Sequence, residues 1–378
     1  MKLTLLSIVL ALAHQTRATR VTGAAEGFAK GVTGGGSAAP VTPKNIVELT
    51  NYLADAQPRV IILDKEFNFK GSEGTVKEMG CRPRTKCSET GGGQDAINHA
   101  SWCTNGNAGA GSKAVSVTYD RAGTLALKVN SNKSIVGVGN KGVIRGKGLR
   151  LAGAKNVIIQ NIHITELNPQ YIWGGDGIQI DGADMVWIDR SKISLVGRQM
   201  LVLGNGASGR VSVTNNEFDG STSWSATCDG HHYWAIYFTG SNDMVTFKGN
   251  YIHHTSGRSP KVGGTTLLHA VNNVWYANSG HAFEILAPKS NALIEGNIFQ
   301  NVVRPMKAST GKVFAPSSVQ AVCNRALGRA CQANSFGSSG PLTGTDSSFL
   351  GLFKGKNPAT ASAASPAISG RAGVGKIA

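Results

Sequence analysis

The stretch MVTFKGNYIH (244–253) contains the pattern that decides the fold: a short alternating strand, a polar corner with Gly and Asn, and a second short apolar strand. From about residue 130 the same pattern recurs, in NVIIQNIHIT (156–165), MVWIDRSKIS (185–194), RVSVTNNEFD (210–219), LLHAVNNVWY (267–276) and ALIEGNIFQN (292–301). A sequence that repeats one unit of short strands predicts an array of stacked units.

The spacing of the repeats identifies the kind of array. Their apolar ends are separated by 29, 25, 34, 23 and 24 residues, at Ile164, Ile193, Phe218, Ile252, Trp275 and Phe299. A four-stranded propeller blade needs about 40 residues. An all-β, single-stranded right-handed parallel β-helix fits, because each coil buries its inward residues on the next. At the corners we expect four asparagines to stack: Asn216, Asn250, Asn273 and Asn297.

Two longer segments interrupt the repeat. One lies between Phe218 and Ile252, and the other runs from about Gly71 to Gly111 with three cysteines. Insertions in solenoids gather on the binding face, so we expect two side loops stapled together through Cys228. The Ala-, Ser- and Gly-rich tail, residues 354–378, is predicted to be an irregular strap or partly disordered. Residues 19–378 are therefore expected to form one domain.

The N-terminus has the pattern of a secretory signal. The apolar run from Leu3 to Ala13 is shorter than the ~20 residues that span a bilayer, and small residues follow it. Residues 1–18 are predicted to be a signal peptide, and the protein to be secreted and extracellular. In an exported chain the six cysteines most simply form three disulfides.

The net charge and the paired histidines indicate which macromolecules and metal ions the protein could bind. The formal charge of +16 becomes 16 − 2 = +14 without Lys2 and Arg17 of the signal, which favours an acidic polymer as partner. Export makes nucleic acid a poor candidate, and no membrane partner is predicted. The pairs 231–232 and 253–254 resemble metal ligands, but neighbours on a strand point to opposite faces. No metal site is predicted.

The loop HHTSGRSPKVGG (253–264) allows two interpretations. Gly257 and Pro260 could shape a solvated turn in which the cations Arg258 and Lys261 only maintain solubility. Alternatively, the turn fixes Arg258 so that it acts on an anionic group.

Several longer segments resemble one known family. The chain is similar to the pectin/pectate lyase family of polysaccharide lyases, specifically its pectin lyase branch, over nearly all of residues 19–378. The matching segments are AEGFAKGVTGGG (25–36), KSIVGVGNKGVIRGKGLRL (133–151), YIWGGDGIQID (171–181), DGHHYWAIY (229–237) and HTSGRSPKV (254–262). The resemblance implies a parallel β-helix whose long side loops form a substrate cleft.

It also implies a reaction: endo-cleavage of methyl-esterified homogalacturonan by β-elimination, without a cofactor or metal. Arg258 would take the C5 proton, Arg198 would supply positive charge where pectate lyases hold calcium, and Asp176 and Lys261 would lie beside them. The reference pKa of Arg is ~12.5–13.8, so deprotonation at pH 8 costs roughly 6–8 kcal/mol. Neighbouring cations would lower that pKa. We therefore expect basic surroundings at Arg258, and activity that rises toward alkaline pH.

The resemblance also implies aromatic cleft walls, which suit sugar faces and methyl esters. The matching residues are Trp173, Trp234, Tyr233, Tyr237 and Trp102. Arg84 stands where close relatives carry another cleft Trp, and Arg190 replaces a His. Fewer aromatics and more cations suggest tolerance of less methylated pectin, a hypothesis that activity confined to fully methylated pectin would contradict.

The remaining implications concern covalent structure and assembly. Counting alone leaves 15 ways to pair six cysteines. The resemblance implies the disulfides Cys81–Cys103, Cys87–Cys228 and Cys323–Cys331. It also implies that the protein is a monomer. Asn132 begins a glycosylation sequon.

Three alternatives remain open. A calcium-dependent pectate lyase needs several carboxylates around one ion, with Asp176, Asp181 and Asp184 as candidates. A hydrolase needs a carboxylate pair, for which Asp176 and Asp181 are conceivable. A non-catalytic protein that binds acidic polysaccharide would be expected to have lost Arg258 or Arg198, and both are present.

Overall fold

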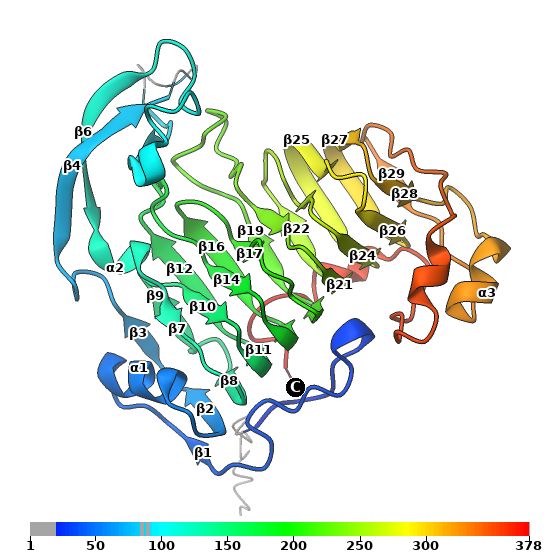
Figure 1. The fold of residues 1–378 in the computed structure, drawn as a ribbon, viewed down its shortest axis with the longest axis horizontal. Coiled ribbons are helices and arrows are strands. Elements are labelled where there is room, and N and C mark those ends of the chain that lie inside the picture. The colour runs from blue at the N-terminus through cyan, green and yellow to red at the C-terminus, as the bar shows by residue number, and fades with distance from the viewer. Residues whose placement is uncertain (1–19, 84–86, 88–90, 378) are drawn as a thin grey trace, which may run out of the picture.

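The computed structural model describes residues 20–83, 87 and 91–377, and shows a right-handed parallel β-helix in which successive coils stack on one another (Figure 1). The predicted signal peptide lies outside the described residues. Three faces run along the solenoid. The first face contains β1 (Pro40–Val41), β2 (Arg59–Leu63), β8 (Lys133–Gly137), β11 (Lys155–Gln160), β15 (Asp184–Asp189), β18 (Arg210–Thr214), β21 (Asp243–Lys248), β24 (Thr266–Val271), β26 (Asn291–Glu295) and β28 (Lys312–Phe314).

The second and third faces become continuous through the long strands β25 (Val274–Ile285) and β27 (Ile298–Ser309). The second face contains β3 (Glu66–Asn68), β9 (Val143–Arg145), β12 (His163–Leu167), β16 (Lys192–Val196), β19 (Glu217–Asp219), β22 (Tyr251–His253) and, after β27, β29 (Ser335–Gly337). The third face contains β7 (Leu127–Lys128), β10 (Leu149–Ala152), β14 (Ile178–Asp181), β17 (Leu201–Leu203), β20 (Ile236–Phe238) and β23 (Lys261–Val262).

The apolar ends of the repeats form one inward column, as the spacing predicted. Each pairs in register with the next: Ile164, Ile193, Phe218, Ile252, Trp275 and Phe299. The column continues to Ile144 before them and to Phe336 after them. The six predicted side chains are at most 1% exposed, and burying each contributes roughly 1.5–3 kcal/mol relative to exposure.

The predicted asparagine stack is present at the corner between the first and second faces. The amide of Asn216 donates to Asn250 at 3.0 Å, Asn250 to Asn273 at 2.9 Å and Asn273 to Asn297 at 3.0 Å. Asn297 donates in turn to Asn334 at 3.0 Å, a rung that the repeat analysis missed. Each amide also donates to a buried backbone carbonyl, which satisfies polar groups that the tight corner leaves without partners.

Short elements close and brace the solenoid. The helix α1 (Ile46–Ala54) is capped by Asn45 and buries Leu49 and Leu53 in the core, so it covers the core beside the first coils. The C-terminal segment is an irregular strap that crosses several coils and binds Asn272, Asn215 and Asn161. The other helices are η1 (Gly27–Ala29), η2 (His99–Ser101), α2 (Arg121–Thr124), η3 (Ala321–Cys323), α3 (Asn324–Leu327), η4 (Leu350–Phe353) and η5 (Pro366–Ile368).

The first insertion forms a separate small sheet that rises along one side of the coils (Figure 1). It contains β4 (Thr75–Arg82), β5 (Asp95–Ala96), β6 (Lys113–Asp120) and β13 (Tyr171–Ile172). The disulfide Cys81–Cys103 closes this insertion, and Cys87–Cys228 joins it to the second one, as predicted. The third disulfide of the implied pairing, Cys323–Cys331, closes a short loop near the C-terminal end of the coils.

Two further features bear on earlier predictions. Asn132 is half-buried and its side-chain oxygen accepts a hydrogen bond from Asn156 at 2.8 Å, so the sequon forms part of a corner. Among the described residues, no helix is long and apolar enough to cross a membrane.

Candidate active site

The loops between the second and third faces bring the predicted residues together. The loop from β12 to β14 carries Asp176, and that from β16 to β17 carries Arg198. The loop from β19 to β20 carries Trp234, and that from β22 to β23 carries Arg258. Since neighbouring strands are about 4.8 Å apart, loops from the same place in successive coils lie side by side.

The Arg258 side chain is fixed by two polar partners. Its Nε donates to the Oε2 of Glu284 at 3.2 Å, and its Nη1 donates to the hydroxyl of Tyr237. The guanidinium carbon lies 5.1 Å from the ring centroid of Tyr233 and 5.2 Å from that of Trp234. Within the described part of the chain, Nη2 has no hydrogen-bond partner, so this nitrogen is available to a substrate.

The surroundings of Arg258 contain the expected cations Lys261 and Arg198, but also groups that raise rather than lower its pKa. Burial lowers the pKa of its guanidinium, but the groups of Tyr237, Tyr233 and Glu284 outweigh burial and raise the pKa above its usual value. Glu284 is only 4% exposed. Burial raises its pKa, but the charges of Arg258 and Lys307 outweigh that effect and hold the carboxyl ionised.

Glu284 is the functional residue that the sequence analysis missed. In register it follows Lys261 on the next coil, 284 − 261 = 23 residues later, which equals the interval from Ile252 to Trp275. Counting one repeat forward from Lys261 would have found it. Burial and then the charge of Arg258 lower the pKa of Lys261, whose ammonium lies 5.7 Å from the ring centroid of Tyr237.

Arg198 and Asp176 form the second part of the site. The guanidinium carbon of Arg198 lies 3.5 Å from the ring centroid of Trp173. The carboxylate of Asp176 accepts from the backbone N–H of Gln199 at 2.9 Å and from the amide of Gln179 at 3.1 Å. Burial raises the pKa of Asp176, and the charge of Arg198 opposes this rise. The two residues thus place a fixed cation and one carboxylate near Arg258, whose charge also acts on Arg198.

The donor set here does not fit calcium, which needs 6–8 oxygen ligands. Asp181 accepts from the backbone N–H of Gly206 at 2.7 Å, in the turn at the opposite edge of the third face from the Asp176 loop. Asp184 forms an ion pair with Arg210 at 2.5 Å on the first face. The three carboxylates therefore do not converge on one position, as a calcium site would need, and Asp176 is the single carboxylate beside the Arg198 guanidinium. Because Asp176 and Asp181 lie at opposite edges of the third face, they do not form the carboxylate pair of a hydrolase.

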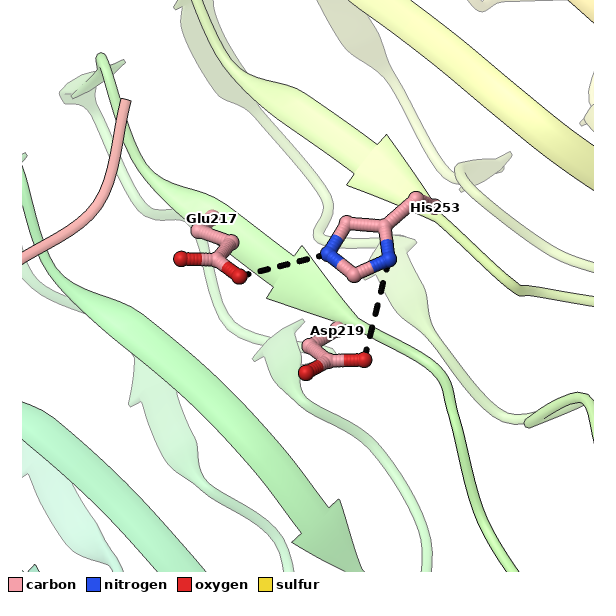
Figure 2. A group of neighbouring side chains, drawn as sticks. All are labelled: Glu217, Asp219 and His253. Carbon is pink, nitrogen blue, oxygen red and sulfur yellow. Dashed lines mark hydrogen bonds and ion pairs between the residues drawn. The ribbon is translucent and has the colours of Figure 1, made fainter. Parts of the chain in front are cut away.

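A different group comes closest to a metal site. Among the described residues, only Glu217, Asp219 and His253 bring three candidate ligand atoms within 4.8 Å of one another. Figure 2 shows the His253 ring between the two carboxylates, with Nε2 3.3 Å from Glu217 and Nδ1 3.7 Å from Asp219. The ammonium of Lys192 contacts both carboxylates, at 2.8 and 2.9 Å. The lysine already occupies one oxygen of each carboxylate and offsets one of the two negative charges, so we assign no metal to this group.

The geometric argument about paired histidines was wrong for one pair. The Nδ1 atoms of His253 and His254 lie 2.8 Å apart. His254 follows the last residue of β22 and has a φ of 52°, so its side chain no longer alternates with that of its neighbour. The alternation rule applies only inside a strand.

Three of the five predicted aromatic residues line one cavity, and the other two, Trp173 and Tyr237, contact the arginines of the site. Trp102, Tyr233 and Trp234 line a cavity of about 320 Å³, together with Gln94, which accepts from the indole N–H of Trp234 at 3.0 Å. Tyr237 differs from the prediction: it is 8% exposed and holds Arg258 rather than presenting a cleft wall.

The structure places one of the two predicted cationic replacements. Arg84 lies outside the described residues. Arg190 follows β15 at the corner between the first and second faces, where it pairs with Asp189 at 2.6 Å and lines a cavity under the C-terminal strap. It therefore lies at a different edge of the solenoid from the loops that carry Arg258 and Arg198.

Comparison with known proteins identifies the family. Residues 101–377 match the family model described as pectate lyase. The chain belongs to this family. Within it, the chain is 57% identical over 376 residues to Pectin lyase B of Emericella nidulans, with 98% of both chains covered. It is 53% identical over 378 residues to Probable pectin lyase A of Aspergillus terreus, again with 98% of both covered. These relatives place it on the pectin lyase branch of the family.

Solved pectate lyases share the fold at low identity. The lyase Bsp165PelA from Bacillus sp. N165, in complex with trigalacturonate, matches with a TM-score of 0.61 and 17% identity, over 94% of this chain and 100% of that one. Pectate lyase C from Erwinia chrysanthemi matches with a TM-score of 0.52 and 16% identity, over 93% and 97%.

Proposed function

We propose that this protein cleaves methyl-esterified homogalacturonan by β-elimination, with Arg258 as the base and without a metal ion. Its membership of a lyase family and its identity to pectin lyases support this proposal. The observation that carries it is the position of Arg198 and a single carboxylate, Asp176, on loops at the same place in the coils as the loop of Arg258, with the Arg198 guanidinium carbon 3.5 Å from the ring centroid of Trp173. A permanent cation occupies the place that a metal-dependent site would fill with further carboxylates.

The proposed reaction needs no water or other co-reactant, because the proton taken from C5 ends on the leaving oxygen of the same substrate. Arg258, deprotonated, takes the C5 proton through Nη2, the one guanidinium nitrogen without a protein partner. The negative charge that develops on the ester oxygen is stabilised by Arg198 and Lys261, because fixed cations in a water-poor site stabilise charge that forms in the transition state. The electron pair forms the C4–C5 double bond as the C4–O bond breaks. Arg258 then returns the proton to the leaving oxygen.

The aromatic cavity supports an esterified substrate. The rings of Tyr233 and Trp234 lie 5.1 and 5.2 Å from the guanidinium carbon of Arg258, and Trp102 lines the same cavity, so the reacting position has an apolar wall that suits a methyl ester. A methyl ester also removes the charge that would make the C5 proton harder to abstract. Both features favour a neutral uronate ester at the reacting position.

The decisive experiment measures ultraviolet absorbance of the unsaturated product during incubation with highly methylated pectin and with polygalacturonate. Each substrate is tested with calcium and with a chelator. We expect absorbance to rise on methylated pectin at the same rate in the presence of chelator. A rise only on polygalacturonate with calcium would overturn the proposal in favour of a pectate lyase. New reducing ends without absorbance would indicate hydrolysis, and neither signal would indicate a binding protein.

We also propose that the mature protein is a secreted monomer that begins near residue 19 and has pectin, rather than nucleic acid or a membrane, as its partner. The positive charge and the three disulfides support this. N-terminal sequencing of protein from culture medium, together with sedimentation, tests it.

The Glu284→Gln variant is expected to shift the pH profile toward lower pH. Glu284 contributes to the raised pKa of Arg258 and contacts its Nε at 3.2 Å. Removing the carboxylate charge lowers the pKa of Arg258, so the neutral base becomes available at lower pH. The maximum rate should fall as well, because the amide orients the guanidinium less firmly. Profiles of kcat/KM against pH for both proteins measure the two effects.

A matched control is Glu66→Gln, which breaks an ion pair with Arg145 on the second face, away from the site loops. We expect its profile to coincide with that of the unmodified protein. A profile for Glu284→Gln that falls uniformly, with no shift, would mean that Glu284 only supports the fold.

A further inference from the structure

The outer surface of the third face carries a row of aligned side chains. Each of these side chains lies opposite the next one on the neighbouring strand, in the order Lys128, Arg150, Gln179, Val202, Tyr237, Lys261 and Glu284. These positions alternate with the buried ones, so they point away from the core. The active-site end of the row contains Tyr237, Lys261 and Glu284. The same row therefore leads from the reacting centre toward the N-terminal coils, where Figure 1 shows β17, β14, β10 and β7 stacked in that order.

The far end of the row is cationic and exposed. Arg150 and Lys128 are both exposed, and within the described part of the chain neither forms an ion pair with a carboxylate. The guanidinium of Arg150 reaches only the side-chain oxygen of Gln179, at 3.4 Å. By contrast, nearby arginines on other faces are neutralised, as Arg145 is by Glu66 and Arg210 is by Asp184. The charges of Arg150 and Lys128 thus remain available to a ligand.

The spacing suits a linear polyuronide. From Lys261 to Arg150 the row crosses four strand spacings, about 19 Å at roughly 4.8 Å each. A pyranose ring linked through positions 1 and 4 is comparable in length to one spacing. A chain that lies along the row from Arg258 therefore brings a sugar over Arg150 about four units from the reacting one, and the next sugar over Lys128.

The chemistry at this end differs from that of the reacting centre. Around Arg258 the walls are aromatic, which suits a methyl ester. Around Arg150 and Lys128 the row offers a guanidinium fork and an ammonium, which bind an ionised carboxylate through charge-assisted hydrogen bonds more strongly than a neutral ester.

We propose that Arg150 and Lys128 form a remote subsite for free galacturonate carboxylates, so that the enzyme prefers a methylated unit at the reacting centre with unesterified units about four and five sugars away. This inference rests on the proposed function, because the row leads to the same cleft. It makes the preferred substrate a partially esterified chain, and it assigns that preference to Arg150 and Lys128.

The test compares Arg150→Gln, Lys128→Gln and the double variant on fully methylated and on half-methylated pectin. On half-methylated pectin we expect KM to rise about three- to tenfold for the double variant, with kcat unchanged, and the rise to shrink at high salt. On fully methylated pectin we expect no change. Lys155→Gln, which removes an exposed lysine on the first face, is the matched control and should leave both substrates unaffected.

Equal KM changes on both pectins, or none on either, would overturn the subsite. Calorimetric titration with saturated oligogalacturonates of increasing length gives an independent readout that needs no turnover. Affinity should increase once the oligomer is long enough to span the row, and the double variant should lose that increase. If the protein cleaves no pectin, the proposed function fails, but the titration still decides whether Arg150 and Lys128 bind uronates.

Discussion

Arg258→Ala is expected to lower kcat on methylated pectin by about 10³-fold, within the 10²–10⁴ range typical of a lost general base. The variant removes the guanidinium that contacts both Tyr237 and Glu284, whose Nη2 has no hydrogen-bond partner among the described residues. KM should change little, because the aromatic cavity proposed to bind the ester remains. Initial rates from ultraviolet absorbance, with circular dichroism and the midpoint of thermal unfolding as checks on folding, measure the effect.

Arg258→Lys separates charge from geometry. A lysine has a reference pKa of ~10.4, so it loses its proton more readily than arginine. Its single nitrogen lacks the planar fork through which Arg258 contacts Tyr237 and Glu284 with two nitrogens and keeps a third one free. If proton loss limits the rate, the lysine variant should retain more activity than the alanine variant, most clearly at alkaline pH. Arg210→Ala, which breaks an ion pair on the first face, is the control. Activity of Arg258→Ala within tenfold of the unmodified protein would show that another group is the base.

The repeat made most of the fold predictable. In a parallel β-helix every coil imposes the same inward and outward alternation, so Ile252 and Trp275 had to fall in one column once the period was recognised. The corner asparagines followed from the same count, except for Asn334. The interval from Phe299 to Phe336 contains the loop closed by Cys323–Cys331, which hides this last repeat.

The site was less predictable, because its contacts join residues from different coils through irregular loops. The motif around Arg258 indicated a cation, but its partner Glu284 comes from the following coil and Tyr237 from the preceding one. Whether Tyr237 forms a cleft wall or a hydrogen bond depends on burial, which an aromatic residue at a strand position does not reveal. Arg190 shows the converse: its sequence neighbours suggested the cleft, but its corner lies at another edge of the solenoid.

Arg198→Ala is expected to lower kcat by about 10²–10³-fold, as the loss of a preorganised electrostatic group does in other active sites. Arg198 lies against the face of Trp173 and next to Asp176, so its charge is held in place by the protein. Without it, the fixed positive charge that stabilises the developing negative charge is lost, and the pKa of buried Asp176 rises further. Single-turnover rates at saturating methylated pectin isolate the effect on the chemical step from the effect on binding.

Added calcium should not restore the Arg198→Ala variant, because Asp176 alone supplies too few oxygens for that ion. Guanidinium ion in solution should restore part of the activity, since the truncated side chain leaves space against Trp173 for a planar cation. Arg210→Ala, treated with the same guanidinium concentrations, controls for general salt effects. Rescue by calcium rather than by guanidinium would mean that the site is a pectate lyase centre in which an arginine has replaced the metal. Asp176 would then be a calcium ligand. Rescue by guanidinium alone would identify the fixed positive charge as the contribution of Arg198.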